Sequence, residues 1–174
     1  MSRSRRRRWW PVVVSLLVAL LVAYVVVTVL VFVRPDLGSV RQPQAVVVLG
    51  GYGDRADQGI AVAQADDIRT VALSTTPLCP KVARLHIDCF WPVPLSTQGE
   101  ARFIATAARL HHWDRIVVVA GTTQVSRARL RIDRCYQGQV AFVGVDPDGF
   151  FGWIHDIAYD QAAMVKAVVW QRGC

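Results

Sequence analysis

Hydrophobic residues dominate the first quarter of the chain in one unbroken stretch. Val12–Val33 is 22 residues long and contains no charged side chain. As a helix that rises about 1.5 Å per residue it would extend roughly 33 Å, which is enough to cross the hydrocarbon core of a bilayer. A core helix in so small a protein would not be apolar on every face. The pattern therefore predicts a transmembrane helix over residues 11–33.

From residue 45 onward the pattern changes to short apolar runs that alternate with segments of helical spacing. The runs predict strands that are buried on both faces, at Ala45–Leu49, Thr70–Leu73, Ile116–Ala120 and Val140–Val145. The helical segments between and after them are Asp57–Asp67, Thr97–His111, Gln124–Tyr136 and Ile157–Trp170. This alternation predicts a Rossmann-like α/β domain over residues 45–174, with a parallel sheet of about four strands and helices on both faces.

Two segments interrupt this rhythm. Residues 34–44 contain Pro35, Gly38 and Pro43 and are predicted to be a linker. Thr75–Leu95 contains four prolines and two cysteines and is predicted to be a long loop. Loops of this length in a compact domain are usually functional or cross-linked.

The basic charge of the chain is concentrated before the domain. The whole chain carries a formal charge of +7, but residues 1–43 hold seven arginines and one acid, which leaves 13 basic and 12 acidic residues for 44–174. A nearly neutral domain argues against a nucleic-acid partner.

The distribution of arginines around the apolar stretch predicts its orientation. Five arginines and the pair Trp9–Trp10 precede it, whereas Arg34 and Arg41 follow it. The positive-inside rule then makes residues 1–10 a cytoplasmic basic segment and places the domain outside the plasma membrane, with the lipid bilayer as a partner. A cleaved signal peptide is the alternative, but the stretch is longer than a usual signal core and no Ala-x-Ala site follows it.

The four cysteines fit an extracytoplasmic domain, because disulfides persist in oxidising compartments. Cys79 and Cys89 are close in sequence and form the easiest pair, and Cys135 with Cys174 is a reasonable second pair. Free thiols and a zinc site remain alternatives. The zinc site has little support, since no C-x-x-C is present and His86 is a lone imidazole nearby, so no metal is expected.

Polar residues that follow the predicted strands are the candidate site, because parallel sheets bind ligands beyond the carboxyl ends of their strands. The first of these segments is Gly50-Gly51-Tyr52-Gly53-Asp54-Arg55. Its glycines permit a tight turn, and its backbone N–H groups and Arg55 favour an anion. It matches neither G-x-G-x-x-G nor a P-loop, and a plain strand-to-helix turn would need the same small residues. The other strand ends carry Ser74-Thr75-Thr76, Gly121-Thr122-Thr123-Gln124 with Ser126 and Arg127, and Asp146.

Glu100, the only glutamate in the chain, has two interpretations. Thr97-x-x-Glu100 has the spacing of a capping box, in which the glutamate side chain returns to the start of its own helix. The other interpretation is a carboxylate at the sheet edge that acts as a base or binds a ligand hydroxyl.

Three segments together resemble the YdcF-like family, a group of unknown function that includes the SanA and ElyC envelope proteins. They are A-V-V-V-L-G-G at 45–51 with Arg55, S-T-Q-G-E-A at 96–101, and T-T-Q-V-S-R-A at 122–128. The resemblance covers about residues 45–172 and implies a Rossmann-like fold with a polar pocket; many such proteins also carry an N-terminal anchor. It assigns pocket roles to Gly50, Gly51, Arg55, Ser96, Thr97, Glu100, Thr122 and Arg127.

One departure from the family bears on chemistry. The family usually has a histidine three residues before the arginine of the third motif, where this chain has Gln124. Glutamine forms hydrogen bonds but does not transfer protons near neutral pH. Histidine-dependent catalysis is therefore not expected, and a catalytic role falls to Glu100 if there is one.

These observations predict a single-pass envelope protein whose outer domain binds a small anionic, phosphorylated ligand. The resemblance implies cell-wall or polyprenyl-phosphate carrier metabolism as the setting. The alternatives are a hydrolase or transferase acting on such a ligand, a domain that binds a nucleotide-type ligand such as S-adenosylmethionine, and a structural envelope protein without a ligand. No cofactor is expected, and the pattern leaves the oligomeric state open.

Overall fold

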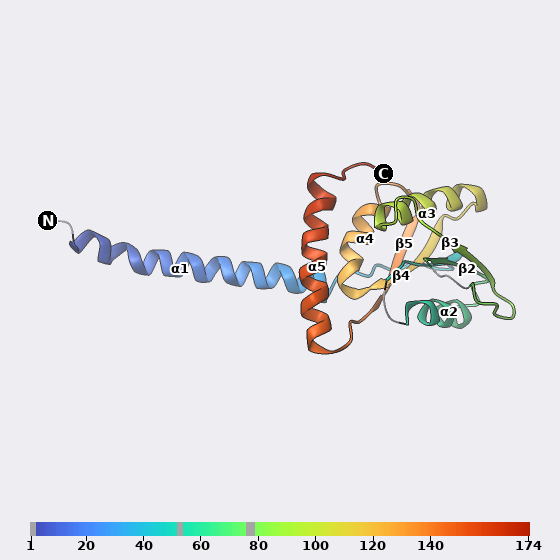
Figure 1. The fold of residues 1–174 in the computed structure, drawn as a ribbon, viewed down its shortest axis with the longest axis horizontal. Coiled ribbons are helices and arrows are strands. Elements are labelled where there is room, and N and C mark those ends of the chain that lie inside the picture. The colour runs from blue at the N-terminus through green and yellow to red at the C-terminus, as the bar shows by residue number, and fades with distance from the viewer. Residues whose placement is uncertain (1–2, 52–53, 76–78) are drawn as a thin grey trace.

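The protein consists of a long N-terminal helix and an α/β domain (Figure 1). The structure is a computed structural model that describes residues 3–51, 54–75 and 79–174. Helix α1 spans Arg3–Thr28 and continues into a π-helical turn, η1, at Val29–Val33. Among the described residues one helix, Trp9–Val33, is long and apolar enough to cross a membrane, and its side chains are almost all exposed.

Five parallel strands form the sheet of the domain. Their bounds are β1 (Ala45–Val48), β2 (Thr70–Ser74), β3 (His86–Phe90), β4 (Arg115–Gly121) and β5 (Gln139–Val145), in the order β3-β2-β1-β4-β5. Strand β1 lies in the centre of the sheet, β2 and β3 follow on one side, and β4 and β5 follow on the other. This confirms the predicted Rossmann-like α/β fold.

Strand β3 is the element that the hydrophobic pattern missed, since it lies inside the segment predicted to be a loop. Its polar residues His86 and Asp88 interrupt the apolar ones, and only Phe90 is buried, so the segment has no continuous apolar run. The prediction of about four strands was therefore one strand short.

Helices cover the sheet unequally on its two faces. Helices α3 (Thr97–His111) and α4 (Val125–Ile132) pack with Val47 and Val118 in one apolar core. Helix α2 (Arg55–Ala65) packs with Val46 and Val119 in the other. Strand residues alternate between the two cores, which explains why β1 and β4 are apolar at nearly every position.

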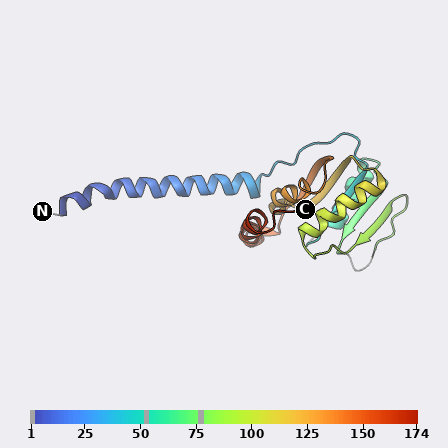
Figure 2. The same ribbon diagram turned by 90° about the horizontal axis from the view of Figure 1, so that it is seen from above.

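Helix α5 (Gly149–Val169) occupies neither face. It lies at the end of the domain nearest α1 and runs crosswise to α1 (Figures 1 and 2). It begins at Gly149, eight residues before the predicted start at Ile157, so the prediction missed its first two turns.

The linker shows which way the strands run relative to α1. It leaves η1, and the carbonyl of Leu37 accepts a hydrogen bond from Phe142 N on the free edge of β5, at 2.7 Å. It then reaches the amino end of the sheet, where Gln44 N donates to Arg115 O at 2.8 Å. Strand β1 therefore runs back toward α1, and the carboxyl ends of all five parallel strands face the end of α1.

Two disulfides are present, Cys79–Cys89 and Cys135–Cys174. Both predicted pairings are therefore confirmed. The first links Cys79, which precedes β3, to Cys89 within β3. The second holds the C-terminal tail against the end of α4, where Arg134 also donates to the carbonyl of Gln171 at 2.9 Å.

We expect the two disulfides to contribute unequally to stability. Replacing Cys135 and Cys174 together with serine removes a cross-link across 39 residues, and the free energy of unfolding should fall by about 4 kcal/mol. The same replacement of Cys79 and Cys89, which are 10 residues apart, should cost about 3 kcal/mol, because a shorter loop restricts the unfolded chain less. Guanidinium unfolding of the full chain in mild detergent, followed by near-UV circular dichroism, measures both. A larger loss for the Cys79–Cys89 variant would contradict this order.

Candidate functional site

Polar groups from several elements meet at the carboxyl ends of β1, β2 and β4 and form one hydrogen-bonded group, which we call the strand-end cluster. Its members come from the end of β2, from α2, α3, α4 and α5, and from the turns after β1 and β4. They are Gly50, Arg55, Ser74, Thr97, Glu100, Thr123, Gln124, Arg127 and Asp160. The prediction that distant motifs would meet at this edge is thus realised in the fold.

Glu100 reaches from α3 across the ends of β1 and β2. Its Oε1 accepts hydrogen bonds from Gly50 N at 2.6 Å and from Ser74 Oγ at 2.7 Å. Oε2 has no hydrogen-bond partner within the ranges that the structure describes. The residue is only 4% exposed, and burial raises the pKa of this carboxyl against the opposing effect of its two donors.

Of the two interpretations of Glu100, the structure contradicts the capping box. Ser96, not Thr97, is the N-cap residue of α3, and the described residues show no side-chain capping hydrogen bond there. Thr97 Oγ1 instead accepts hydrogen bonds from Gln124 Nε2 at 3.3 Å and from Arg127 Nη1 at 2.7 Å. Both Thr97 and Glu100 therefore bind residues of other elements and not the start of their own helix. The carboxylate of Glu100 lies at the strand ends as a result.

Arg55 lies in the first turn of α2, with its guanidinium between the backbones of two glycines. A Cβ atom on Gly51 would lie 2.0 Å from Nη1, and one on Gly121 would lie 2.6 Å from Nη2. Gly51 also has φ +146°, a conformation that other residues avoid. Small residues at both strand ends therefore make room for this side chain.

The guanidinium of Arg55 is bonded only in part. Nη1 donates to Gly50 O at 2.8 Å and to Gln124 Oε1 at 2.9 Å. Nε is buried without a hydrogen-bond partner, and Arg55 forms no ion pair with a carboxylate in the described part of the chain. Burial lowers the pKa of Arg55, and the nearby Asp156, Glu100 and Asp160 act in the opposite direction.

Gln124 connects the two arginine-bearing segments. Its carbonyl oxygen accepts from Arg55 while its amide donates to Thr97, and the residue is buried. Both ends of the amide are thus used in holding neighbours in place. This geometry gives Gln124 a positioning role within the cluster.

Arg127 has an internal counter-charge that sequence analysis missed. Its Nε and Nη2 donate to Asp160 Oδ1 at 3.0 and 2.7 Å, and Thr123 Oγ1 donates to Asp160 Oδ2 at 2.7 Å. Asp160 is 4% exposed and lies on α5. The available signal was the pair Asp156 and Asp160, two acids one turn apart in a largely apolar helix.

The remaining predicted site residues have other positions. Thr122 Oγ1 donates to Asp146 Oδ1 at 2.5 Å, beside the cluster on the β5 side. Ser96 is exposed, and its side chain forms no hydrogen bond to any described residue. The N–H of Gly50, expected to face an anion, is donated to Glu100. Tyr52, Gly53 and Thr76 lie outside the described residues.

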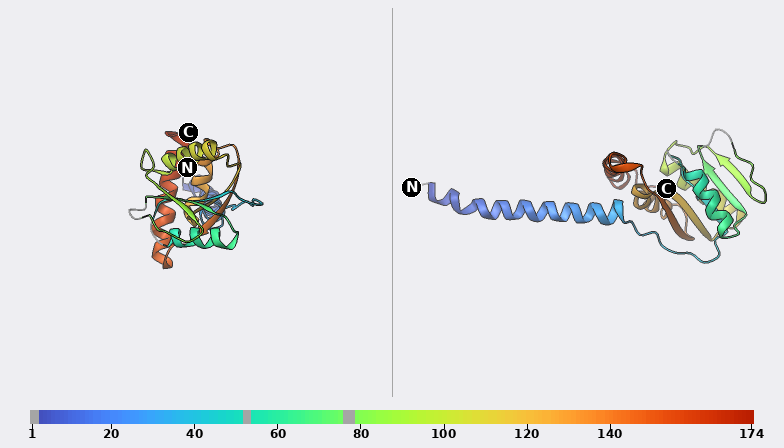
Figure 3. Two further views of the ribbon diagram at one scale, coloured as in Figure 1. Left: turned by 90° about the vertical axis from the view of Figure 1, so that its right-hand side faces the viewer. Right: turned by 90° about the horizontal axis from the view of Figure 1, so that it is seen from below.

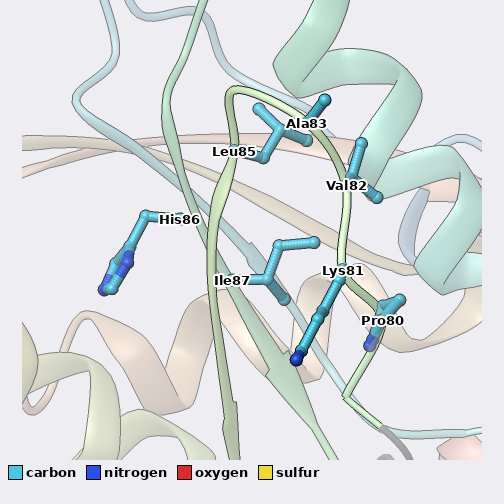
Figure 4. Close-up of a pocket in the computed structure, with 7 residues that line it drawn as sticks. All are labelled: Pro80, Lys81, Val82, Ala83, Leu85, His86 and Ile87. Atoms are coloured by element: carbon cyan, nitrogen blue, oxygen red, sulfur yellow. The ribbon is translucent and has the colours of Figure 1, made fainter.

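Two hollows in the described surface lie away from the strand-end cluster. One is lined by Pro80–Val82, Ala83 and Leu85–Ile87, at the turn before β3 (Figure 4). Another lies between the end of α2 and the same turn, beside Asp67 and Arg84. Both are at the amino end of the sheet, where parallel α/β proteins do not place their ligands. Polarity and unpaired charge, and not surface shape, mark the strand-end cluster as the candidate site.

Comparisons with known proteins do not assign the chain to a family. No protein-family model matches it, and no curated protein or solved structure matches it either. The resemblance to YdcF-like proteins therefore rests on the three motifs alone.

The raised pKa of Glu100 predicts a pH-dependent stability. A carboxyl whose pKa is higher in the folded state binds its proton more tightly there, so the free energy of unfolding falls as the pH rises from the ordinary value of 4.5 to the folded value. Glu100→Gln retains an oxygen for Gly50 and Ser74 but does not titrate. We expect the stability of this variant relative to the wild type to increase with pH above 4.5, as measured by urea unfolding at a series of pH values. A constant difference across that range would contradict the shift.

Proposed function

We propose that the protein is a single-pass, membrane-anchored envelope protein whose α/β domain binds a small phosphorylated ligand at the strand-end cluster. The observation that carries this proposal is Arg55. Its guanidinium is partly buried, one of its nitrogens is buried without a partner, and it has no ion pair among the described residues. A desolvated cation in this state is costly unless an anion offsets its charge.

The two arginines of the cluster have different roles in this proposal. Arg127 is already neutralised by Asp160, and all the donors that it uses are directed to Asp160 and Thr97. Arg55 retains donor capacity and charge, so it is the residue that would bind a phosphate oxygen. We therefore assign Arg127 to positioning and Arg55 to ligand binding.

The position of the cluster favours a ligand that belongs to the membrane surface. Ser126 Oγ, in the first turn of α4, donates to Val31 O at the end of the apolar helix, at 2.6 Å. The start of α4, which also carries Arg127, is thus hydrogen-bonded to the end of the membrane-span candidate. With α1 in a bilayer, the strand-end cluster would lie beside the lipid headgroups.

Apolar side chains next to the cluster suit the lipid part of such a ligand. Trp91, Val93 and Leu95 are all more than half exposed. Their loop packs against the start of α3, where a Cβ on Gly99 would lie 2.0 Å from Pro94 O. A polyprenyl phosphate combines a phosphate for Arg55 with a chain for this apolar loop, in line with the metabolism that the YdcF-like resemblance implies.

An acid–base enzyme on the same ligand is the second candidate, and Glu100 is the observation that favours it. Its pKa is raised by burial, and Oε2 is not engaged by a described residue. Carboxylates with raised pKa values serve as general acids and bases. Turnover lost in Glu100→Gln with ligand binding retained would support the enzyme.

The binding proposal predicts a selective loss in Arg55→Ala. Removing the guanidinium takes away a charge-assisted hydrogen bond worth about 1.5–3 kcal/mol, so the affinity for geranyl phosphate, a short soluble polyprenyl phosphate, should fall roughly tenfold to more than a hundredfold. Isothermal titration calorimetry of the full chain in detergent measures this. Arg69→Ala is the matched control, because Arg69 is exposed at the opposite edge of the sheet. Equal binding by Arg55→Ala and the wild type would contradict the proposal.

The orientation proposal predicts where the domain is found. The five arginines before the apolar helix should hold the N-terminus in the cytoplasm and place the domain outside, where Cys79–Cys89 and Cys135–Cys174 can persist. Alkaline phosphatase fused after Cys174 should be active, and a fusion to a reporter that works only in the cytoplasm should be silent. The opposite pattern would reject the orientation.

A further inference from the structure

Helix α5 carries a continuous apolar face that no described part of the domain covers. Its residues recur every three or four positions, which places them on one side of a helix. We call this face the α5 stripe, and it consists of Phe151, Ile154, Ala158, Ala162, Val165 and Val169. All six residues are exposed, with Phe151 at 84% and Val165 at 54%.

The α5 stripe faces away from the domain. Asp160 and Ala167, the two buried residues of α5, lie on the opposite side of the helix by their spacing. Asp160 faces inward to Arg127, as the ion pair between them requires. The stripe must therefore face outward from the end of the domain that α5 covers.

Contacts between α5 and α1 show which way the end of the domain covered by α5 faces. Gln161 accepts a hydrogen bond from Tyr24 at 3.0 Å and donates to Thr28 at 3.1 Å. Figure 2 and the right-hand view of Figure 3 show α5 end-on beside the last turns of α1, on the side of the domain that faces the N-terminus. The stripe thus points back along α1, toward the apolar part of that helix.

The depth of the contact can be estimated from α1. The apolar helix Trp9–Val33 has 25 residues, whereas a hydrocarbon core about 30 Å thick needs about 20. With the helix centred in that core, Thr28 lies roughly 5 Å and Tyr24 roughly 10 Å below the outer boundary. Interfacial helices bury their apolar faces to about this depth, 5–10 Å.

We propose that α5 is a second membrane-contacting element, which lies flat in the outer interface of the bilayer with the α5 stripe in the acyl region. This rests on the proposal that α1 spans the membrane. Phe150 and Trp170, exposed at the two ends of α5, are suited to the headgroup layer. The α5 stripe and the contacts of Gln161 with α1 would together fix the depth of α5 in the interface. Through the Arg127–Asp160 pair, α5 would also hold the strand-end cluster at the level of the lipid phosphates.

Site-directed fluorescence separates this inference from the anchor on which it depends. Three single-cysteine variants of the full chain, with both native disulfides intact, would carry the polarity-sensitive dye NBD. Ala162→Cys reports on the stripe, Leu17→Cys on the middle of α1, and Thr106→Cys on an exposed position of α3. Each protein is reconstituted in phosphatidylcholine–phosphatidylglycerol vesicles, with or without lipids that carry a nitroxide near the headgroup.

We expect blue-shifted emission and strong nitroxide quenching at position 162, with water-like emission and little quenching at 106. The probe at 17 should be blue-shifted and quenched more by a nitroxide deep in the acyl chain. Water-like emission at 162 together with a membrane signal at 17 would overturn the α5 inference and leave the anchor intact. Water-like emission at both positions would reject the anchor.

A second copy of the chain on the stripe is the remaining alternative outcome. In that case the probe at 162 would be blue-shifted but not quenched by nitroxide lipids. Val165→Asp provides an independent test that does not need a dye. The charge opposes burial in lipid, so proteoliposomes should show faster proteolysis of the α5 segment in this variant than in Lys166→Asp, a substitution beside the stripe. Equal proteolysis in the two variants, with both proteins folded, would also contradict the inference.

Discussion

The ion pair between Arg127 and Asp160 is the interaction on which the rest of the arrangement depends. It is nearly enclosed, with the two side chains 12% and 5% exposed, and Thr123 and Thr97 bind the remaining atoms. Removing one partner of such a pair leaves a buried charge and typically costs about 3–5 kcal/mol. The pair joins the start of α4 to α5, and through Thr97 it also reaches α3. Three helices are therefore held in register at the carboxyl edge of the sheet.

That constraint determines the electrostatics of the candidate site. Asp160 forms an ion pair with Arg127, so Arg127 and Arg55 are not electrostatically equivalent. Arg55 remains beside glycines that bring the backbone close to its guanidinium, with Gln124 in place of a charged partner. Glu100 is nearby, but its Oε1 accepts hydrogen bonds from Gly50 N and Ser74 Oγ, and its burial works against ionisation. A cation that has no ion pair among the described residues and a carboxyl with a raised pKa are thus neighbours at the point where ligands of parallel sheets bind.

The same edge of the sheet faces α1. The linker carries the chain from η1 to the amino end of the sheet along the free edge of β5, and β1 then returns. Because every strand is parallel to β1, the direction of β1 places all the carboxyl ends of the strands on the side of α1. The strand-end cluster and α5 lie on the same side. Ser126 and Gln161 complete the contact from the domain. The topology therefore places the strand-end cluster on the side of the domain that faces α1.

Much of this protein was determined by local sequence. Continuous apolar runs in β1, β2 and β4 reflect burial on both faces, and β5 has such a run although it is only partly buried. The uncharged Val12–Val33 predicts a candidate membrane span by its length and composition. Strand β3 was missed because His86 and Asp88 interrupt its apolar residues. The meeting of Arg55, Glu100, Gln124 and Arg127 followed from parallel topology, since the carboxyl ends of parallel strands share one edge.

The partners of these side chains depend on contacts between elements that are distant in sequence. Thr97 and Glu100 have the spacing of a cap, yet partners on other elements engage both, because interactions across the fold outweigh a local bond at a helix end. Asp160 is remote in sequence and lies in a helix with no motif, so its pairing with Arg127 is not encoded in spacing. The order of strands and helices along the chain specifies which residues can reach the edge of the sheet. Packing between α3, α4 and α5 brings Asp160 to Arg127, whereas Arg55 has no ion pair among the described residues.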